Sequence, residues 1–314
     1  MTVDLLTLGE AMVSLRTDSL LRLGGHLTVS VAGAESNVAI AMARLGHRTR
    51  WVGRVGDDEF GALVLRTLRA EQVDLEYAVV TEGRVTGLAV FDTGPGGVRR
   101  VHYRRTTSAA GALSPQDVDP ALRAGARLLH VTGITPALGE LPARTVRHAM
   151  GAADSTGATV CLDVNFRQKL WSSSQASRTL RPLLPLVDVL VASEHELPLV
   201  ADGPDEDARA KDLLELGIGE VVVKRGAAGA TVHTHELTVS APALRVPLVD
   251  TVGAGDAFTA GYLSGLLDGL GLAGRLHRGV LLGAAAVSSA GDWEALPTRA
   301  ELDHIGGGHE DAQR

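Results

Sequence analysis

The chain has 314 residues, 45% of them hydrophobic and 21% charged, which is the composition of a globular protein with a sizeable core. A net charge of −7 argues against general binding to nucleic acid or to anionic membranes, although a local basic patch can still hold an anionic ligand. Aromatic residues make up only 3%, so the core must be filled by Leu, Val and Ala, and base-stacking platforms are scarce.

Strand and helix patterns alternate along most of the chain. A buried strand is predicted over 3–10 and a helix over 35–47, followed by a strand over 49–56 and an amphipathic helix over 60–73. The same signals then predict these later elements: strands over 126–133, 158–165, 187–193, 220–226 and 230–240, and a helix over 141–157. Such alternation indicates βαβ crossovers and a mostly parallel sheet.

Two segments break this alternation, 12–33 and 86–107. Both are rich in strand patterns and lack a helix. The second reads as a hairpin whose two runs are joined by Gly94-Pro95-Gly96-Gly97. The pattern fits a small β-sheet that covers a ligand site, and it fits an edge decoration of the main sheet equally well.

No signal for secretion or membrane insertion is found. The opening MTVDLLTLGE is acidic where a signal peptide is basic, and no apolar run approaches the ~18 residues of a membrane helix. The single cysteine, Cys161, cannot form an internal disulfide, and its apolar neighbours predict an inert core residue. We therefore expect a cytoplasmic protein.

The segment VDTVGAGDAFTAGYLSGLL, residues 249–267, carries the strongest chemical signal. A tight turn is predicted at Gly253, Ala254 and Gly255, with a helix after Asp256. Small residues let backbone N–H groups approach an anion, and the helix dipole adds positive potential there. Asp256 is then placed to accept a proton from an attacking hydroxyl. The residues alone also fit a plain bend followed by a carboxylate that the helix dipole favours.

Other motif classes are missing from the sequence. No G-x-x-x-x-G-K-[ST] phosphate loop occurs, and no G-x-G-x-x-G follows the first predicted strand, which argues against a nicotinamide-dependent dehydrogenase. No serine lies in a G-x-S-x-G elbow. His233 and His235 are two residues apart on a predicted strand, but no third ligand accompanies them.

Residues 250–258, DTVGAGDAF, resemble the C-terminal signature of the ribokinase-like, or PfkB, family of carbohydrate kinases. Residues 32–46 and 52–61, AGAESNVAIAMARLG and VGRVGDDEFG, are similar to the family's N-terminal signature, with Ala32 where glycine is usual. The resemblance runs from Leu5 to about Ala300. It implies a ribokinase-like three-layer α/β fold with a mostly parallel central sheet and a small β-sheet lid.

The resemblance also sets the expected organisation and ligands. Residues 1–305 would form the kinase domain, with lid strands within 12–33 and 86–107, and residues 306–314 a polar C-terminal tail. ATP with Mg²⁺ and a small sugar or sugar acid would be the ligands, without nucleic acid or membrane. Lid strands often pair between subunits in this family, so a homo-oligomer through the lid is possible.

Roles follow from the resemblance residue by residue. Asp256 would be the catalytic base, and the amides of Gly253, Ala254 and Gly255 would form the anion hole for the transferred phosphate. The expected nucleotide-side residues are Asn165, Arg167, Ser193, Lys224, Gly226, Gly229, Gly253 and Gly255. The expected sugar-side residues are Gly33, Ala34, Asn37, Tyr103, Arg105, Arg167, Asp256 and Asp292.

The metal position rests on LVASEHEL, which is similar to the family's N-x-x-E element. Glu196 is kept and would be the carboxylate near Mg²⁺, whereas Ser193 replaces the asparagine. Mg²⁺ retains several waters and bridges phosphate oxygens, so one nearby carboxylate is chemically sufficient. Without the resemblance, these residues read as a solvated acidic helix start.

The sugar is indicated by DVNFRQKLW, residues 163–171, which looks like the form found in 2-keto-3-deoxygluconate kinases. Arg167 from this segment and Arg105 from the lid strand offer guanidinium forks to a sugar carboxylate, with Tyr103 on the same strand face as Arg105. Alternatively, Arg167 binds ATP phosphate and Arg105 is a surface charge. Ala89 stands where relatives often carry an aromatic residue.

The resemblance therefore predicts phosphorylation of 2-keto-3-deoxygluconate at its C6 hydroxyl. The alternatives are a kinase for fructose, ribose or 5-dehydro-2-deoxygluconate, or a catalytically silent sugar sensor on the same fold.

Overall fold

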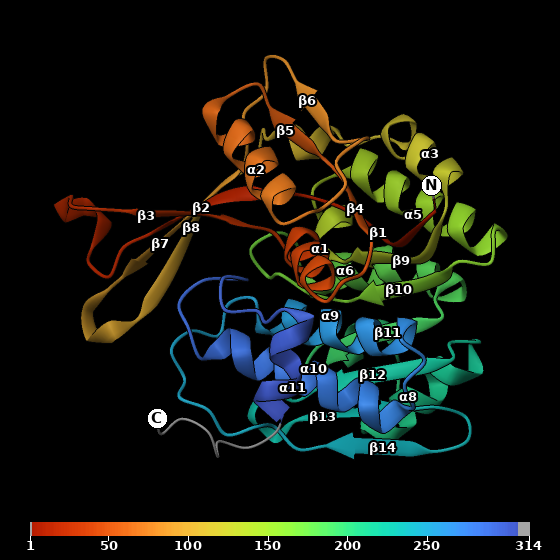
Figure 1. Ribbon diagram of the computed structural model, residues 1–314. Helices are drawn as coiled ribbons and strands as arrows, with labels where there is room; N and C mark the ends of the chain where they lie inside the picture. Colours follow the sequence, from red (N-terminus) through yellow and green to blue (C-terminus); the bar gives the residue numbers. More distant parts are fainter. Residues whose placement is uncertain (1, 307–314) are drawn as a thin grey trace.

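The computed structural model describes residues 2–306, so the expected polar tail lies outside the described residues apart from Gly306. Its centre is an eight-stranded sheet in the order β14-β13-β12-β11-β10-β9-β1-β4 (Figure 1). Six of the strands are parallel: β1 (Val3–Leu8), β4 (Thr49–Val52), β9 (Ala126–Thr132), β10 (Thr159–Asp163), β11 (Val189–Ser193) and β12 (Glu220–Lys224). At the edge, β13 (Ala230–His233) pairs antiparallel with β12, and β14 (Thr238–Ala241) pairs antiparallel with β13.

Helices cover both faces of this sheet. One face packs against α1 (Ala34–Arg44), α9 (Ala254–Leu267) and α10 (Leu272–Val287), and the other against α3 (Pro115–Ala124), α5 (Glu140–Ser155), α6 (Ser173–Leu180), α7 (Leu197–Val200) and α8 (Glu206–Glu215). The remaining helices are α2 (Glu59–Ala70), α4 (Ile134–Ala137) and α11 (Arg299–Gly306). Short 3₁₀ turns occupy Leu21–Leu23, Pro95–Gly97, Ala109–Ala112, Arg181–Leu186 and Gly226–Ala228.

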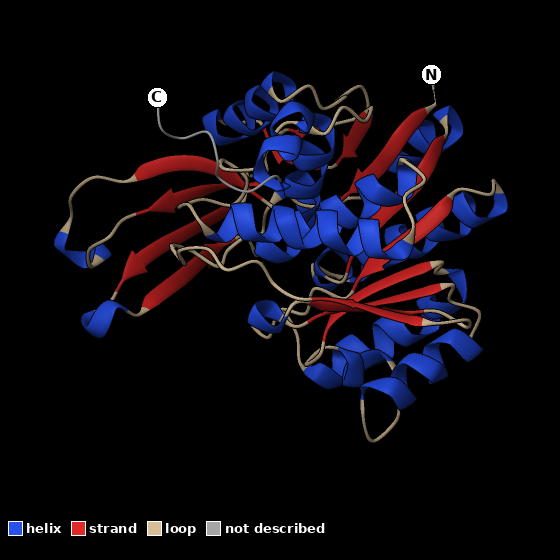
Figure 2. Ribbon diagram, turned by 60° about the horizontal axis from the view of Figure 1, so that its bottom comes forward, coloured by secondary structure: helices blue, strands red, loops and turns tan. Residues whose placement is uncertain are grey.

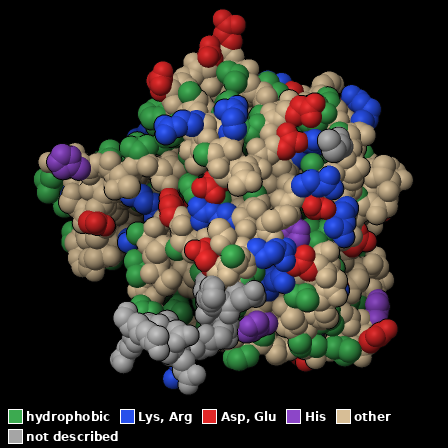
Figure 3. Space-filling view, in the orientation of Figure 1, with side chains coloured by type: hydrophobic (Ala, Val, Ile, Leu, Met, Phe, Trp, Pro, Cys, Tyr) green, Lys and Arg blue, Asp and Glu red, His purple; other side chains and the backbone are tan. Residues whose placement is uncertain are grey.

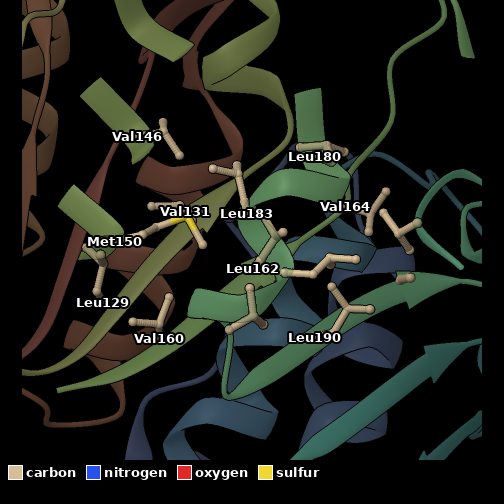
Figure 4. Packing of buried hydrophobic residues seen from close by; sticks show 14 of the residues in the cluster. Leu129, Val131, Val146, Met150, Val160, Leu162, Val164, Leu180, Leu183 and Leu190 are labelled. Atoms are coloured by element: carbon tan, nitrogen blue, oxygen red, sulfur yellow. The ribbon is translucent and has the colours of Figure 1, made fainter. Parts of the chain in front are cut away.

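Side-chain alternation along each strand explains why the sheet is buried on both faces. In β10, Val160 and Leu162 point into the core beneath α5 and α6, whereas Cys161 points into the core beneath α1 and α9. Figure 4 shows the first of these cores, where Met150 of α5 meets the strand residues. Cys161 is fully buried, as its apolar neighbours predict.

A second sheet of four strands extends from one side of the body (Figures 1 and 2). Its order is β3-β2-β7-β8, formed by β3 (Thr28–Ala32), β2 (Met12–Arg16), β7 (Leu88–Thr93) and β8 (Arg99–Arg104). The hairpin between β7 and β8 closes where the amide of Gly94 donates to the carbonyl of Val98 at 2.8 Å. We call this sheet the lid.

Two predicted strands are divided in the structure. Residues 49–56 split into β4 and β5 (Arg54–Gly56), and β5 pairs with β6 (Val79–Thr81) away from the central sheet. The split falls at Gly53, where an added Cβ would lie 2.4 Å from the carbonyl oxygen of Gly9. Residues 230–240 form the β13–β14 hairpin, because Thr234 closes a turn on Leu237.

The surface mixes charges of both signs. On the face in Figure 3, basic and acidic side chains lie among one another rather than in one continuous basic region. Within residues 2–306, none of the helices combines the length and the apolar character needed to cross a bilayer.

Candidate active site

A cavity of about 500 Å³ lies between the lid and the carboxyl ends of the parallel strands. Open α/β sheets bind their ligands at this edge. Most of the predicted site residues line it: Gly33, Ala34, Asn37, Tyr103, Arg105, Asn165, Arg167, Ser193, Glu196, Lys224, Gly226, Gly253, Gly255, Asp256 and Asp292. Ala254 and Gly229 do not line the cavity. Gly229 instead packs against the end of β14, since a Cβ added at Gly229 would lie 2.0 Å from the carbonyl oxygen of Ala241.

Asp256 is held by two amides from distant segments. Its Oδ2 accepts a hydrogen bond from Nδ2 of Asn37 on α1 at 2.9 Å, and its Oδ1 accepts one from Nδ2 of Asn165 at 3.1 Å. Asn165 follows β10 with a φ of 39°, a conformation that asparagine tolerates better than most residues. The carboxyl is only 5% exposed, and burial raises its pKa although Arg167 and Asn37 oppose the shift. A fixed carboxylate of raised basicity can accept a proton from an alcohol.

The helix that carries Asp256 begins earlier than the sequence predicts. α9 starts at Ala254, so Ala254 and Gly255 belong to its first turn, and the expected three-residue turn is wrong. Both small residues are compatible with helix geometry, and only Gly253 needs a left-handed φ, which is 77°. The first amides of a helix have no partner within the helix, so this end of α9 can receive an anion.

Beneath this turn lies an ion pair that the sequence did not reveal. Nζ of Lys224 is 2.7 and 3.0 Å from the two carboxylate oxygens of Asp163, and Oγ1 of Thr259 donates to the same carboxylate at 2.8 Å. Burial lowers the pKa of Lys224, but the nearby carboxylates of Asp163, Glu196 and Asp256 together outweigh that effect and the pKa is raised. An added Cβ at Gly255 would lie 3.5 Å from Nζ, so the cation lies against the helix start.

Glu196 joins the segment after β10 to the end of β11 at the edge of the cavity. Its Oε1 accepts from the Phe166 amide at 2.6 Å and its Oε2 from the Ser193 amide at 2.7 Å. Within the part of the chain that the structure describes, no group of three or more His, Cys, Asp or Glu side chains is placed to hold a metal. The donors present therefore fit a Mg²⁺ ion held mainly by nucleotide phosphates and water, not one caged by protein.

The lid side of the cavity holds a buried ion pair. Arg105 is bonded to Glu10, and their side chains are 8% and 1% exposed. Oε1 of Glu10 also accepts from Oγ of Ser108 at 2.8 Å, and burial raises the Glu10 pKa against the opposing effect of Arg105. The alternative that Arg105 is a surface charge is thus wrong. Arg167, by contrast, is exposed and has no ion pair among residues 2–306.

An apolar surface completes the lid side. Met12, Ala32 and Ala89 form a small buried cluster with Phe91 and Val101 on the inner face of the lid. All five line the cavity, so its lid side has an apolar wall, whereas amide and charged side chains such as Asn37, Asn165 and Lys224 also line the cavity.

The family model of pfkB family carbohydrate kinases matches residues 3–299. The chain belongs to this family. It is 35% identical over 310 residues to the 2-dehydro-3-deoxygluconokinase of Bacillus subtilis (strain 168), which covers 96% of this chain and 95% of that one. A fructokinase of Escherichia coli is 37% identical over 315 residues, with 96% and 99% covered. The solved structure of a fructokinase with bound ATP from Xylella fastidiosa has a TM-score of 0.84 at 26% identity, covering 97% and 98%.

These similarities confirm the ribokinase-like α/β fold and the sugar phosphotransferase class that the two motifs predict. They do not single out one sugar, because PfkB relatives named for a sugar acid and for fructose match this chain about equally well.

One buried carboxyl of this PfkB kinase has no expected role. Glu35, in the first turn of α1, accepts hydroxyl hydrogen bonds from Thr132 at 2.6 Å and Thr135 at 2.7 Å. Burial raises its pKa to about 7. Gly9 makes room for it, since an added Cβ there would lie 2.3 Å from its Cδ. Glu35 thereby ties α1, which carries Asn37, to the end of β9 and to α4.

Proposed function

We propose that this kinase transfers the γ-phosphoryl group of ATP to the C6 hydroxyl of 2-keto-3-deoxygluconate. The observation that carries the proposal is that Arg105 and Arg167 reach the same cavity as Asp256, from the lid and from the core. A sugar acid needs such groups for its carboxylate, whereas a neutral sugar does not. The 35% identity to the Bacillus subtilis 2-dehydro-3-deoxygluconokinase supports the same substrate.

The two arginines would contribute differently. Glu10 already compensates the charge of Arg105, so Arg105 supplies oriented N–H donors more than net charge. Arg167 lacks an ion-pair partner among the described residues and would supply the positive charge for the sugar carboxylate.

In the transfer step, Asp256 would accept the proton of the hydroxyl as its oxygen attacks the γ-phosphorus in line. The first amides of α9 would receive the transferred phosphoryl group, and Lys224 adds positive charge beneath them. Mg²⁺ would supply positive charge against the phosphates, and Glu196, the carboxylate of the N-x-x-E element, would lie near it in the cavity. The lid would exclude water, which limits futile ATP hydrolysis.

A second candidate, fructokinase, is favoured by two observations. Glu10 neutralises Arg105, which lowers the positive charge available for an acid, and the Escherichia coli fructokinase is 37% identical.

An ADP-release assay with 2-keto-3-deoxygluconate, 5-dehydro-2-deoxygluconate, fructose and ribose separates the candidates. We expect kcat/KM for 2-keto-3-deoxygluconate to exceed that for fructose by ~10-fold or more, about the value of one ionic contact. Arg167→Gln should raise KM for the acid and leave KM for ATP unchanged. Arg104→Gln, an exposed lid position, is the matched control. Fructose as best substrate, or an effect of Arg167→Gln on ATP alone, overturns the proposal.

A further inference from the structure

Arg16, at the end of lid strand β2, connects the lid to two separate segments of the body. Its Nη1 donates to Oδ2 of Asp250 at 2.6 Å, and its Nη2 is bonded to Oδ1 of Asp292. Its Nε donates to Ser14 at 3.1 Å, and its guanidinium lies 4.5 Å above the ring centre of Phe91. Every polar group of the side chain thus has a partner, although Arg16 does not line the cavity.

Both carboxylates belong to the backbone that shapes the helix start. Oδ1 of Asp250 accepts from the Val252 amide at 3.2 Å, directly before Gly253. The carbonyl oxygen of Asp292 would lie only 2.1 Å from a Cβ added at Gly253, so the two backbones are in close contact. Arg16 therefore holds together the two segments that form the turn at the start of α9.

A short chain of contacts continues from Asp292 to Asp256. Arg16 donates a hydrogen bond to Oδ1 of Asp292. The other carboxylate oxygen of Asp292, Oδ2, lies 3.5 Å from Nδ2 of Asn37. The same amide nitrogen donates to Oδ2 of Asp256 at 2.9 Å. A change in the position of Asp292 thus changes what Asn37 can offer to Asp256.

We infer that Arg16 is a positioning residue that makes the arrangement of Asp256 and of the α9 start depend on closure of the lid. When the lid is seated, Arg16 fixes Asp250 and Asp292 in place. When the lid lifts, both carboxylates lose their shared partner and the turn at Gly253 loses its clamp. The kinase would then assemble its transfer site only over a bound sugar, which protects ATP from water.

The environment of this contact separates it from an ordinary surface ion pair. The side chains of Arg16, Asp250 and Asp292 are 13%, 2% and 8% exposed, so water screens the contact weakly. Arg99, on β8, also pairs with Asp250 but is 42% exposed and contacts no second carboxylate. The forked contact to both segments is specific to Arg16 among the described residues.

The test compares Arg16→Gln with Arg99→Gln and with Arg22→Gln, a lid position that is exposed and has no ion pair among residues 2–306. Kinetics use whichever sugar the wild type turns over best. Because small misplacements of reacting groups are costly, we expect Arg16→Gln to lower kcat ~10-fold or more, to raise KM for the sugar, and to leave KM for ATP within about twofold. Arg99→Gln should lower kcat by less than about threefold, and Arg22→Gln should leave kcat unchanged. Arg16→Lys keeps the positive charge but loses the guanidinium that reaches two carboxylates, so its kcat should lie between those of the wild type and Arg16→Gln.

Hydrogen exchange supplies an independent readout in the protein without substrate. Arg16→Gln should speed amide exchange in residues 249–253 and in β2, while exchange in β10 and β11 stays as in the wild type. This distinguishes a local release from partial unfolding, and it does not depend on which sugar is used. A failure of the sugar-acid proposal therefore leaves this inference testable. Unchanged exchange together with kcat and sugar KM within twofold of wild type overturns it.

Discussion

Asp256 combines two opposing influences on one carboxyl group. Burial raises its pKa, while the amide of Asn37 and the charge of Arg167 lower it. Nearby Asp292 carries a pKa that burial raises to about 6, and the charge of Asp256 adds to that shift. The outcome is a carboxyl that is a stronger base than an exposed aspartate.

This electrostatic balance predicts a pH dependence. The proton acceptor works when ionised, so kcat/KM should fall as pH decreases through the pKa of Asp256, which is raised above the 3.8 of an ordinary aspartate. Asn37→Ala removes a hydrogen bond that lowers the Asp256 pKa. The fall of kcat/KM on the acid side of the pH profile should therefore occur at higher pH in this variant. Rate profiles between pH 4.5 and 8.5 for both proteins check this. A fall that stays in place or moves to lower pH contradicts it.

Some site residues were open to sequence reasoning and others were not. Asp256 and Asn165 belong to short motifs whose spacing and neighbours signal a site. Asp163 opens the same motif as Asn165, but nothing in that motif shows that it pairs with Lys224. Glu10 and Arg16 gave no such signal, because their partners Arg105 and Asp250 are far away in sequence. Only the order of the strands brings Asp163 and Lys224 together, at the ends of β10 and β12 with β11 between them.

At the scale of elements, the start of α9 depends on one glycine. Gly253 has a φ of 77° and lies against the carbonyl of Asp292. The alternation of strands and helices was predictable because buried strands read as apolar runs. The exact start of α9 and the break at Gly53 were not, since both depend on contacts with another backbone.

Gly253→Ala tests this turn. The left-handed backbone alone costs about 1–2 kcal/mol for alanine, and the added Cβ also meets Asp292. We expect urea unfolding to show a loss of about 2–4 kcal/mol and kcat to fall with it. Gly157→Ala is the matched control, because Gly157 has a φ of 73° with open space around its Cβ position and lies far from the cavity lining. Equal losses in both variants contradict a special role for the Gly253 contact.

At the scale of the whole molecule, a parallel sheet and a lid meet over one cavity. The parallel order of β9 to β12 places the ends of four strands side by side, and the lid brings Tyr103 and Arg105 opposite them. The two strand-rich segments in the sequence pointed to a small additional sheet but left its position open. Its seating depends on contacts such as the indole N–H of Trp293 donating to Val31 at 2.8 Å, which no pattern in either segment reveals.

Asp256, as the group that accepts the sugar proton, is the residue on which the proposed transfer step depends most. Asp256→Asn keeps the shape of the side chain and removes its basicity. Steady-state ADP release, measured for the wild type and this variant with the best sugar, should show kcat lower by ~100-fold or more in the variant, with KM for ATP and the thermal midpoint nearly unchanged. A variant that keeps kcat within a few-fold of the wild type would contradict the account.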